Sequence, residues 1–274
     1  MYLCPLCQQP LLANPQGLAC ASRHQFDRAR EGYLNLLPVQ QKKSLDPGDS
    51  ASMIQARRAF LQAGFYQALS DAVNQQLQAL PLPDNAVLLD IGCGEGYYSA
   101  RVQQSLRPEK PQLQCFGIDI SKAAVKAAAK QYPQLQVAVA SSYQLPFASQ
   151  SIDALLRIYA PSKAAELARV CRPGGYLLTV TPAPEHLLQL KQRIYSEVRL
   201  HPASVATEAG FSHLQRQQLS WTFQPADAAA LSQLLQMIPL GYRFSEDSRQ
   251  QLLLDLPAIS LDFYLDLYQR TAEL

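Results

Sequence analysis

The sequence predicts an α/β fold, in which a doubly wound, mostly parallel sheet follows a small N-terminal zinc-binding domain. From residue 86 onward, short apolar runs alternate with helical patterns, as in buried parallel strands joined by right-handed crossovers. Three of the six cysteines and one histidine lie within the first 24 residues, at a spacing typical of a metal site. Hydrophobic residues make up 48% of the 274 residues and charged residues 17%, which excludes a disordered chain.

The order of these patterns divides the chain into three predicted parts. A Cys/His-rich segment that ends in an apolar patch covers residues 1–37. A polar linker with Pro and Gly, followed by a connecting helix, covers residues 38–65, and the main α/β domain covers residues 66–274. The sequence has no run of 18 apolar residues and no secretory signal, so we expect no membrane partner and a cytoplasmic protein.

Short continuous apolar runs predict strands, and apolar residues at helical spacing predict helices. The predicted strands cover residues 86–91, 114–118, 136–140, 152–158, 176–181, 216–223 and 261–268. The predicted helices cover residues 51–63, 66–80, 122–131, 164–170, 187–198 and 226–237, with one more that ends near residue 106. Ser121 is a predicted helix cap, as is Asp49 or Ser50. The expected result is a mostly parallel seven-stranded sheet.

A glycine-rich turn follows the first strand of the main domain. Gly92, Gly94 and Gly96 have the spacing G-x-G-x-G, which differs from the G-x-G-x-x-G of dinucleotide sites and disfavours an NAD-dependent enzyme. Glycine lets the main chain bend tightly and lie against a ligand. Asp119 ends the second strand, where a carboxylate can accept hydrogen bonds from a ribose diol. The pattern predicts a cofactor that contains a nucleoside.

This region resembles motif one and the acidic loop of the class I S-adenosylmethionine-dependent methyltransferases. The resemblance implies that Asp119 binds the ribose and that the segment from Ala140 to Tyr143 contacts the adenine. It implies a cofactor lining formed by Asp90, Gly92, Gly94, Glu95, Gly96 and Ser141.

The loop after the fourth strand lies where that family places the methyl acceptor. Here it reads Arg157-Ile158-Tyr159-Ala160-Pro161, without the Asn/Asp-Pro-Pro-aromatic pattern, which disfavours N6-adenine methylation. Tyr159 either stacks on a base or packs at the strand end. His186 follows the fifth strand near the same rim and has either an active-site or a structural role.

The strongest local pattern is Cys4-x2-Cys7-x12-Cys20-x3-His24. Two pairs of closely spaced ligands predict a tetrahedral zinc site. Because four protein ligands leave no open coordination position, the metal is expected to be structural. Residues 1–58 have seven Lys/Arg and four Asp/Glu, a net charge of +3, which hints at contact with a polyanion.

The chain joins a Cys₃His segment to a class I methyltransferase pattern and also contains the motif Glu31-Gly32-Tyr33-Leu34-Asn35-Leu36-Leu37. From residue 1 to about 200 this combination resembles the 23S ribosomal RNA (guanine-N1)-methyltransferases. The resemblance implies a zinc module that recognises RNA, a homodimer, and a guanine in a 23S rRNA hairpin loop as the acceptor. It implies contacts with S-adenosylmethionine from Tyr66, Gly94, Glu95 and His186.

In-line methyl transfer to guanine N1 requires loss of the N1 proton, so a base or a group that stabilises the anion is expected. Glu95, Tyr159 and His186 are the candidates for this role, and water is another. Two other functions stay open at this point: a small-molecule methyltransferase with a structural zinc site, and a non-catalytic RNA-binding protein. If the zinc module recognises RNA, deleting residues 1–40 should abolish RNA methylation and leave cofactor binding intact.

Overall fold

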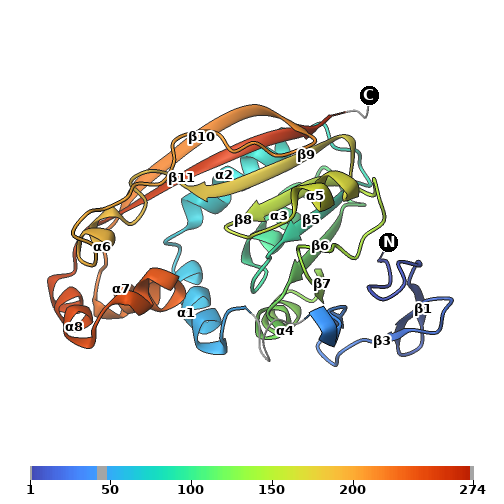
Figure 1. Cartoon of the computed structure of the whole chain (residues 1–274), viewed down its shortest axis with the longest axis horizontal. Coiled ribbons are helices and arrows are strands. Elements are labelled where there is room, and N and C mark those ends of the chain that lie inside the picture. Colours follow the sequence, from blue (N-terminus) through green and yellow to red (C-terminus); the bar gives the residue numbers. More distant parts are fainter. Residues whose placement is uncertain (1, 42–47, 272–274) are drawn as a thin grey trace.

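A central eight-stranded sheet organises the structure, a computed structural model that describes residues 2–41 and 48–271. Its strands are β4 (Leu34–Asn35), β5 (Val87–Ile91), β6 (Gln114–Asp119), β7 (Gln136–Val139), β8 (Ile152–Ile158), β9 (Cys171–Pro182), β10 (Phe211–Phe223) and β11 (Ile259–Arg270). They lie in the order β10-β11-β9-β8-β5-β6-β7-β4 (Figure 1). The six strands from β9 to β4 are parallel, and β10 and β11 are antiparallel.

The eighth strand corrects the predicted count of seven. Strand β4 pairs with β7 in parallel, with Leu34 opposite Ala138. It has only two residues, and its partner lies about a hundred residues further along the chain, so no local pattern could reveal it. The apolar patch that ends the Cys/His segment therefore covers the edge of the main sheet, where Leu34, Leu36 and Leu37 are buried.

The N-terminal segment also forms a small sheet of its own. Its strands are β1 (Leu12–Asn14), β2 (Gly17–Ala19) and β3 (Gln25–Asp27), which are antiparallel. The ring of Tyr2 packs against Phe116 and Phe147 of the main domain, at centroid distances of 5.5 and 5.0 Å. The backbone N–H of Leu3 donates to the carbonyl of Pro146 at 2.9 Å, so the segment is fixed against the main domain.

The helices cover both faces of the sheet and extend one end of it. They are α1 (Ala51–Gln62), α2 (Gln67–Gln78), α3 (Tyr97–Leu106), α4 (Lys122–Gln131), α5 (Ala164–Val170), α6 (Leu188–Gln192), α7 (Ala228–Met237) and α8 (Glu246–Asp255). Helices α7 and α8 lie at the opposite end of the molecule from the N-terminal segment, and α1 lies between α7 and α4 (Figure 1). The predicted caps are confirmed, because Ser50 accepts from the N–H of Met53 and Ser121 from that of Ala124.

Three predicted elements have different bounds. The helix expected over 187–198 covers only Leu188–Gln192, because Leu187 adopts a left-handed φ of 56° and the chain after 195 is largely exposed. Strand β9 begins at Cys171 and not at residue 176 as predicted, and β10 begins at Phe211 and not at residue 216. Helix α8 was not predicted. Residues 42–47, part of the predicted linker over 38–50, lie outside the described residues. Within the described ranges, no helix combines the length and the apolar character needed to cross a membrane.

Candidate active site and zinc centre

The glycine-rich turn joins β5 to α3 in a conformation that favours glycine. Gly92, Gly94 and Gly96 have φ values of 75°, 56° and 84°. A Cβ atom on Gly92 would lie 2.4 Å from the Cβ of Ala160, which follows β8. The carboxyl ends of β5 and β8 are neighbours in the sheet, so the turn and the loop after β8 are in contact. This is the crevice where doubly wound folds bind ligands.

Asp119, at the end of β6, holds the turn in place. One carboxylate oxygen accepts from the N–H of Gly94 at 3.0 Å, and the other accepts from the N–H of Ser121 at 2.8 Å. Each oxygen has further acceptor capacity, so the two bonds leave room for a ribose diol. Binding of the ribose by Asp119 stays a prediction.

Asp90 lies behind the turn. Its side chain is 2% exposed, and the Ser99 hydroxyl donates to it at 2.5 Å, so it links β5 to α3. Burial raises the pKa of this carboxyl to about 7. The direct contact with a cofactor that the sequence suggested stays a prediction, since the described bond faces the helix.

Glu95 has a buried oxygen that needs a partner. The side chain is 3% exposed, and its Oε2 has no hydrogen-bond partner among the described residues. Burial raises its pKa to about 7, although the positive charges of Arg57 and Arg58 oppose this rise. An unpartnered buried carboxylate oxygen is costly. The ammonium group of a methionine moiety would satisfy it, so this residue fits S-adenosylmethionine.

Arg57 of α1 approaches the same turn and was not singled out as a site residue from the sequence. Its guanidinium forms an ion pair with Asp49 at 2.5 Å and donates to the carbonyl of Met237 at 3.3 Å. The Ser121 hydroxyl donates to the carbonyl of Asp49 at 2.9 Å. The start of α1 is thereby tied to the loop after β6, a contact that joins residues more than seventy positions apart.

An aromatic rim, formed by the rings of Tyr66, Tyr159, His186 and Phe263, lies on the other side of the turn. His186 lies 4.7 Å from Phe263 and 5.9 Å from Tyr159, measured between ring centroids. Tyr159 is 45% exposed, so this residue lies at the border between the aromatic cluster and solvent. Its φ of 55° is left-handed, as is that of Leu187, and strain of this kind in residues other than glycine gathers at functional sites.

Tyr66 and Ser141 complete the predicted set. Tyr66 is buried, and its ring lies 5.4 Å from that of Phe263, on the same aromatic rim as His186. Ser141 is half-buried beyond the end of β7, where its hydroxyl accepts from the N–H of Tyr143 at 3.2 Å. Both side chains thus lie at the carboxyl edge of the sheet, and their contacts with a cofactor stay predictions.

The environment of His186 argues against a role as a general base. Burial and the charge of Lys191 lower its pKa to about 3, so the ring is neutral at physiological pH. The backbone N–H of Asp262 donates to its Nδ1 at 3.3 Å. The other ring nitrogen then bears the hydrogen, and the neutral ring can donate a hydrogen bond but has no free acceptor for a proton.

The four predicted zinc ligands come together. The ligand atoms of Cys4, Cys7, Cys20 and His24 all lie within 4.8 Å of one another. The Nδ1 of His24 lies 3.5 Å from the Cys4 sulfur and 3.3 Å from the Cys20 sulfur, and the Cys7 and Cys20 sulfurs are 3.6 Å apart. A tetrahedral ion with Zn–S bonds of about 2.3 Å requires separations of roughly 3.5–3.8 Å. The donor set therefore fits a closed, structural zinc site.

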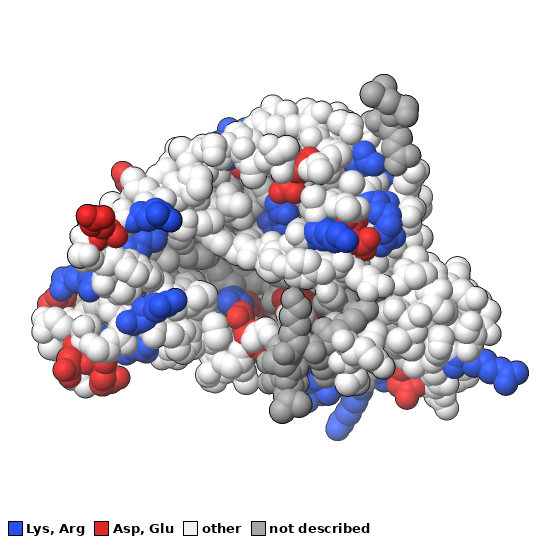
Figure 2. Space-filling model, in the orientation of Figure 1, with Lys and Arg blue, Asp and Glu red and all other residues white. Residues whose placement is uncertain are grey.

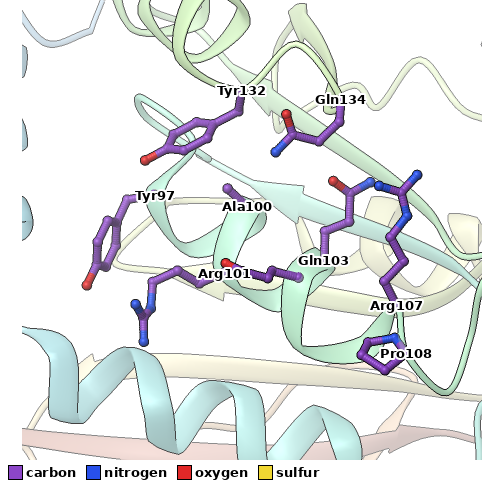
Figure 3. A pocket seen from close by; sticks show the side chains of 9 residues that line it. Tyr97, Ala100, Arg101, Gln103, Arg107, Pro108, Tyr132 and Gln134 are labelled. Atoms are coloured by element: carbon purple, nitrogen blue, oxygen red, sulfur yellow. The ribbon is translucent and has the colours of Figure 1, made fainter.

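Two concave regions are distinct. Figure 2 shows a recess between the sheet and the helices α1 and α7, with charged side chains inside it. A separate hollow of about 800 Å³ lies along α3, lined by residues that include Tyr97, Gln103, Arg107 and Tyr132 (Figure 3). No acidic residue and no glycine of the turn lines this hollow, so it lacks the groups that the cofactor requires.

Comparisons with known proteins agree with both parts of the chain. A zinc-ribbon family model described as "RlmA, N-terminal" matches residues 2–45, and a model described as "Methyltransferase domain" matches residues 89–179. The 23S rRNA (guanine(748)-N(1))-methyltransferase of Streptomyces fradiae is 33% identical over 264 residues, which cover 93% of this chain and 91% of the relative.

Two further relatives are provisionally named 23S rRNA (guanine-N(1)-)-methyltransferases. One, from Micromonospora griseorubida, is 34% identical and covers 85% of this chain and 80% of its own length. The other, YxjB of Bacillus subtilis, is 30% identical and covers 97% of this chain and 95% of its own length. The chain therefore belongs to the family of 23S rRNA (guanine-N1)-methyltransferases.

Proposed function

Because the chain belongs to the family of 23S rRNA (guanine-N1)-methyltransferases, we propose that it transfers the methyl group of S-adenosylmethionine to N1 of one guanine in a hairpin loop of 23S rRNA. The observation that supports this most is the extent of the similarity, since more than nine tenths of the chain aligns with the Streptomyces fradiae enzyme. A small-molecule methyltransferase or a NAD-dependent enzyme would not need the zinc ribbon that this chain carries.

The turn after β5 holds the cofactor in this proposal. The main chain at Gly92 and Gly94 lies against it, Asp119 accepts from the ribose, and the unpartnered oxygen of Glu95 accepts from the methionine ammonium group. The cofactor supplies an electrophilic methyl group whose leaving group is neutral. The protein therefore needs no acid for the leaving group, and its task is to align the acceptor and to exclude water.

The aromatic rim receives the acceptor base. The exposed part of Tyr159 provides a stacking surface, and Phe263 and Trp221, whose ring centroids lie 5.2 Å apart, close the apolar side. His186 donates a hydrogen bond from its neutral ring. Guanine N1 is paired in a duplex, so the acceptor must come from a loop or be flipped out of a stem.

The zinc ribbon contributes structure and RNA contacts in this proposal. Zinc binding by Cys4, Cys7, Cys20 and His24 supports a segment that is too small to form a core of its own. The ribbon, as part of a homodimer that acts in the cytoplasm, holds the hairpin while the acceptor base enters the site.

Incubation with radiolabelled S-adenosylmethionine and 23S rRNA tests the proposal. We expect label in the RNA from the wild type, a loss of at least tenfold with Asp119→Asn, and unchanged transfer with Asp84→Asn, which removes an exposed carboxylate far from the turn. Label that appears in small molecules of a cell extract and never in the RNA would contradict the proposal.

A further inference from the structure

The side chain of Lys191 is buried without a partner. It extends from α6, is 9% exposed, and its Nζ has no hydrogen-bond partner among the described residues. A buried ammonium group that is neither paired nor hydrogen-bonded is strongly disfavoured in a folded protein. Such a group persists where a ligand supplies the missing acceptor, and none of the roles assigned above uses it.

The surroundings of Lys191 place it on the acceptor side of the site. Its charge contributes, after burial, to lowering the pKa of both His186 and His201, whose ring centroids lie 6.4 Å apart. His186 in turn contacts Tyr159, the proposed stacking surface. The amine therefore lies close to His186, which belongs to the rim that receives the base.

Nothing described in this region neutralises the amine. Asp262 is the carboxylate that faces His186, but it already accepts from Ser220, from Gln218 at 2.8 Å and from the N–H of Glu185 at 3.1 Å. Burial alone lowers the pKa of Lys191, with no opposing acid.

Two arginines near the strand ends have acidic partners. Arg57 pairs with Asp49 at 2.5 Å, and Arg157 pairs with Glu208. Lys191, in contrast, is buried and has no hydrogen-bond partner within the described residues.

We propose that Lys191 donates a hydrogen bond from its ammonium group to O6 of the target guanine and so stabilises the guanine anion that attacks the methyl group. The inference rests on the proposed function and identifies a further catalytic residue for it. When N1 loses its proton to solvent, the negative charge is shared between N1 and O6. The N1 electron pair then forms the N–CH₃ bond, the S–CH₃ bond breaks with its electron pair passing to sulfur, and Lys191 keeps its protons throughout.

The test compares Lys191→Met with Lys191→Arg and with the control Lys130→Met, which removes an exposed positive charge from α4. We expect Lys191→Met to lower kcat about 100-fold, as removal of a preorganised donor does at other sites. The RNA KM and the calorimetric Kd for S-adenosylmethionine should change less than threefold. Lys191→Arg should recover part of kcat, and Lys130→Met should match the wild type.

The pH profile separates this role from a structural one. Without the ammonium group the N1 proton is harder to remove, so kcat of Lys191→Met should keep rising to a higher pH than that of the wild type. In Lys191→Ala, added methylammonium should restore part of kcat, because it supplies the missing donor.

Three results would overturn the inference. The first is a kcat for Lys191→Met within threefold of the wild type. The second is an increase in RNA KM alone, which would indicate a contact with a phosphate, and the third is weaker binding of S-adenosylmethionine that accounts for the whole loss of activity. Failure of the proposed function is read separately, from the wild-type arm, as an absence of methyl transfer to RNA.

Discussion

Substituting Gly92 with alanine should damage both the fold and the cofactor site. Gly92 has a φ of 75°, and an added Cβ would lie 2.4 Å from the Cβ of Ala160. The left-handed backbone costs alanine about 1–2 kcal/mol. The clash adds about 1–3 kcal/mol, the usual cost of overpacking. The expected loss in the free energy of unfolding is therefore about 2–5 kcal/mol.

Gly174 offers a matched control for this substitution. Its φ is 76°, and a Cβ there would meet no atom within 4 Å. Gly174→Ala should lose only the backbone contribution, so the two variants should differ by about 1–3 kcal/mol, or roughly 2–10 °C in Tm. The clash also pushes the loop with Ala160 and Tyr159 away from the turn. Gly92→Ala should therefore bind S-adenosylmethionine at least tenfold more weakly, whereas Gly174→Ala should bind it normally.

Urea unfolding and isothermal titration calorimetry measure these two quantities. The reasoning fails if Gly92→Ala is no less stable than Gly174→Ala and binds S-adenosylmethionine with the wild-type Kd. It fails also if both variants lose cofactor binding to the same degree, since Gly174 lies in β9 outside the site.

Three other predictions follow from the same groups. The folded state raises the pKa of Asp90 from 3.8 to about 7, so between these pH values it retains a proton that the unfolded chain releases. The free energy of unfolding should therefore fall by up to about 4 kcal/mol as the pH rises from about 4 to about 7, and Asp90→Asn should show a smaller fall in urea titrations, whereas equal falls would contradict the assignment. The imidazole resonances of His186 should not titrate between pH 5 and 8 in NMR spectra, because its pKa is lowered to about 3, and a midpoint near 6.5 would refute its neutral role. Chelation of zinc should lower Tm and speed hydrogen exchange in β7, because β4, which belongs to the same N-terminal segment as the zinc ligands, pairs with that strand. Unchanged exchange in β7 would show that zinc binding and the pairing of β4 with β7 are independent.

Strand β4 also changes the meaning of a truncation. Deletion of residues 1–40 was expected to remove RNA recognition and leave cofactor binding intact. The deletion would also remove Leu34 and Leu36, which are 1% and 2% exposed, and would leave an edge of the main sheet uncovered. Single substitutions on the surface of the ribbon, such as Arg23→Ala, test RNA recognition without this damage.

The sequence could predict the inner strands because each is buried on both faces. Residues 87–91 and 152–156 are buried, so both runs are apolar except for one aspartate each, and this pattern is local. Strand β10 is exposed along much of its length, and its pairing with β11 determines its start at Phe211. Strand β4 depends entirely on a distant partner, so local pattern could not find it.

The candidate site shows the same division. The zinc ligands and the glycines follow local spacing, and the structure brings the four zinc ligands together. Arg57 and Lys191 were missed because their importance arises from burial and from partners that are distant in the sequence or absent. The lowered pKa of His186 also depends on tertiary contacts, since burial and the charge of Lys191 cause it.

Identification of the methylated nucleoside tests the central claim most directly. After transfer by the purified protein, digestion of 23S rRNA to nucleosides and mass spectrometry should find the new methyl group in N1-methylguanosine, at one position of the RNA. Methyl groups on another base or on another atom of guanine, or on many positions at once, would contradict the account.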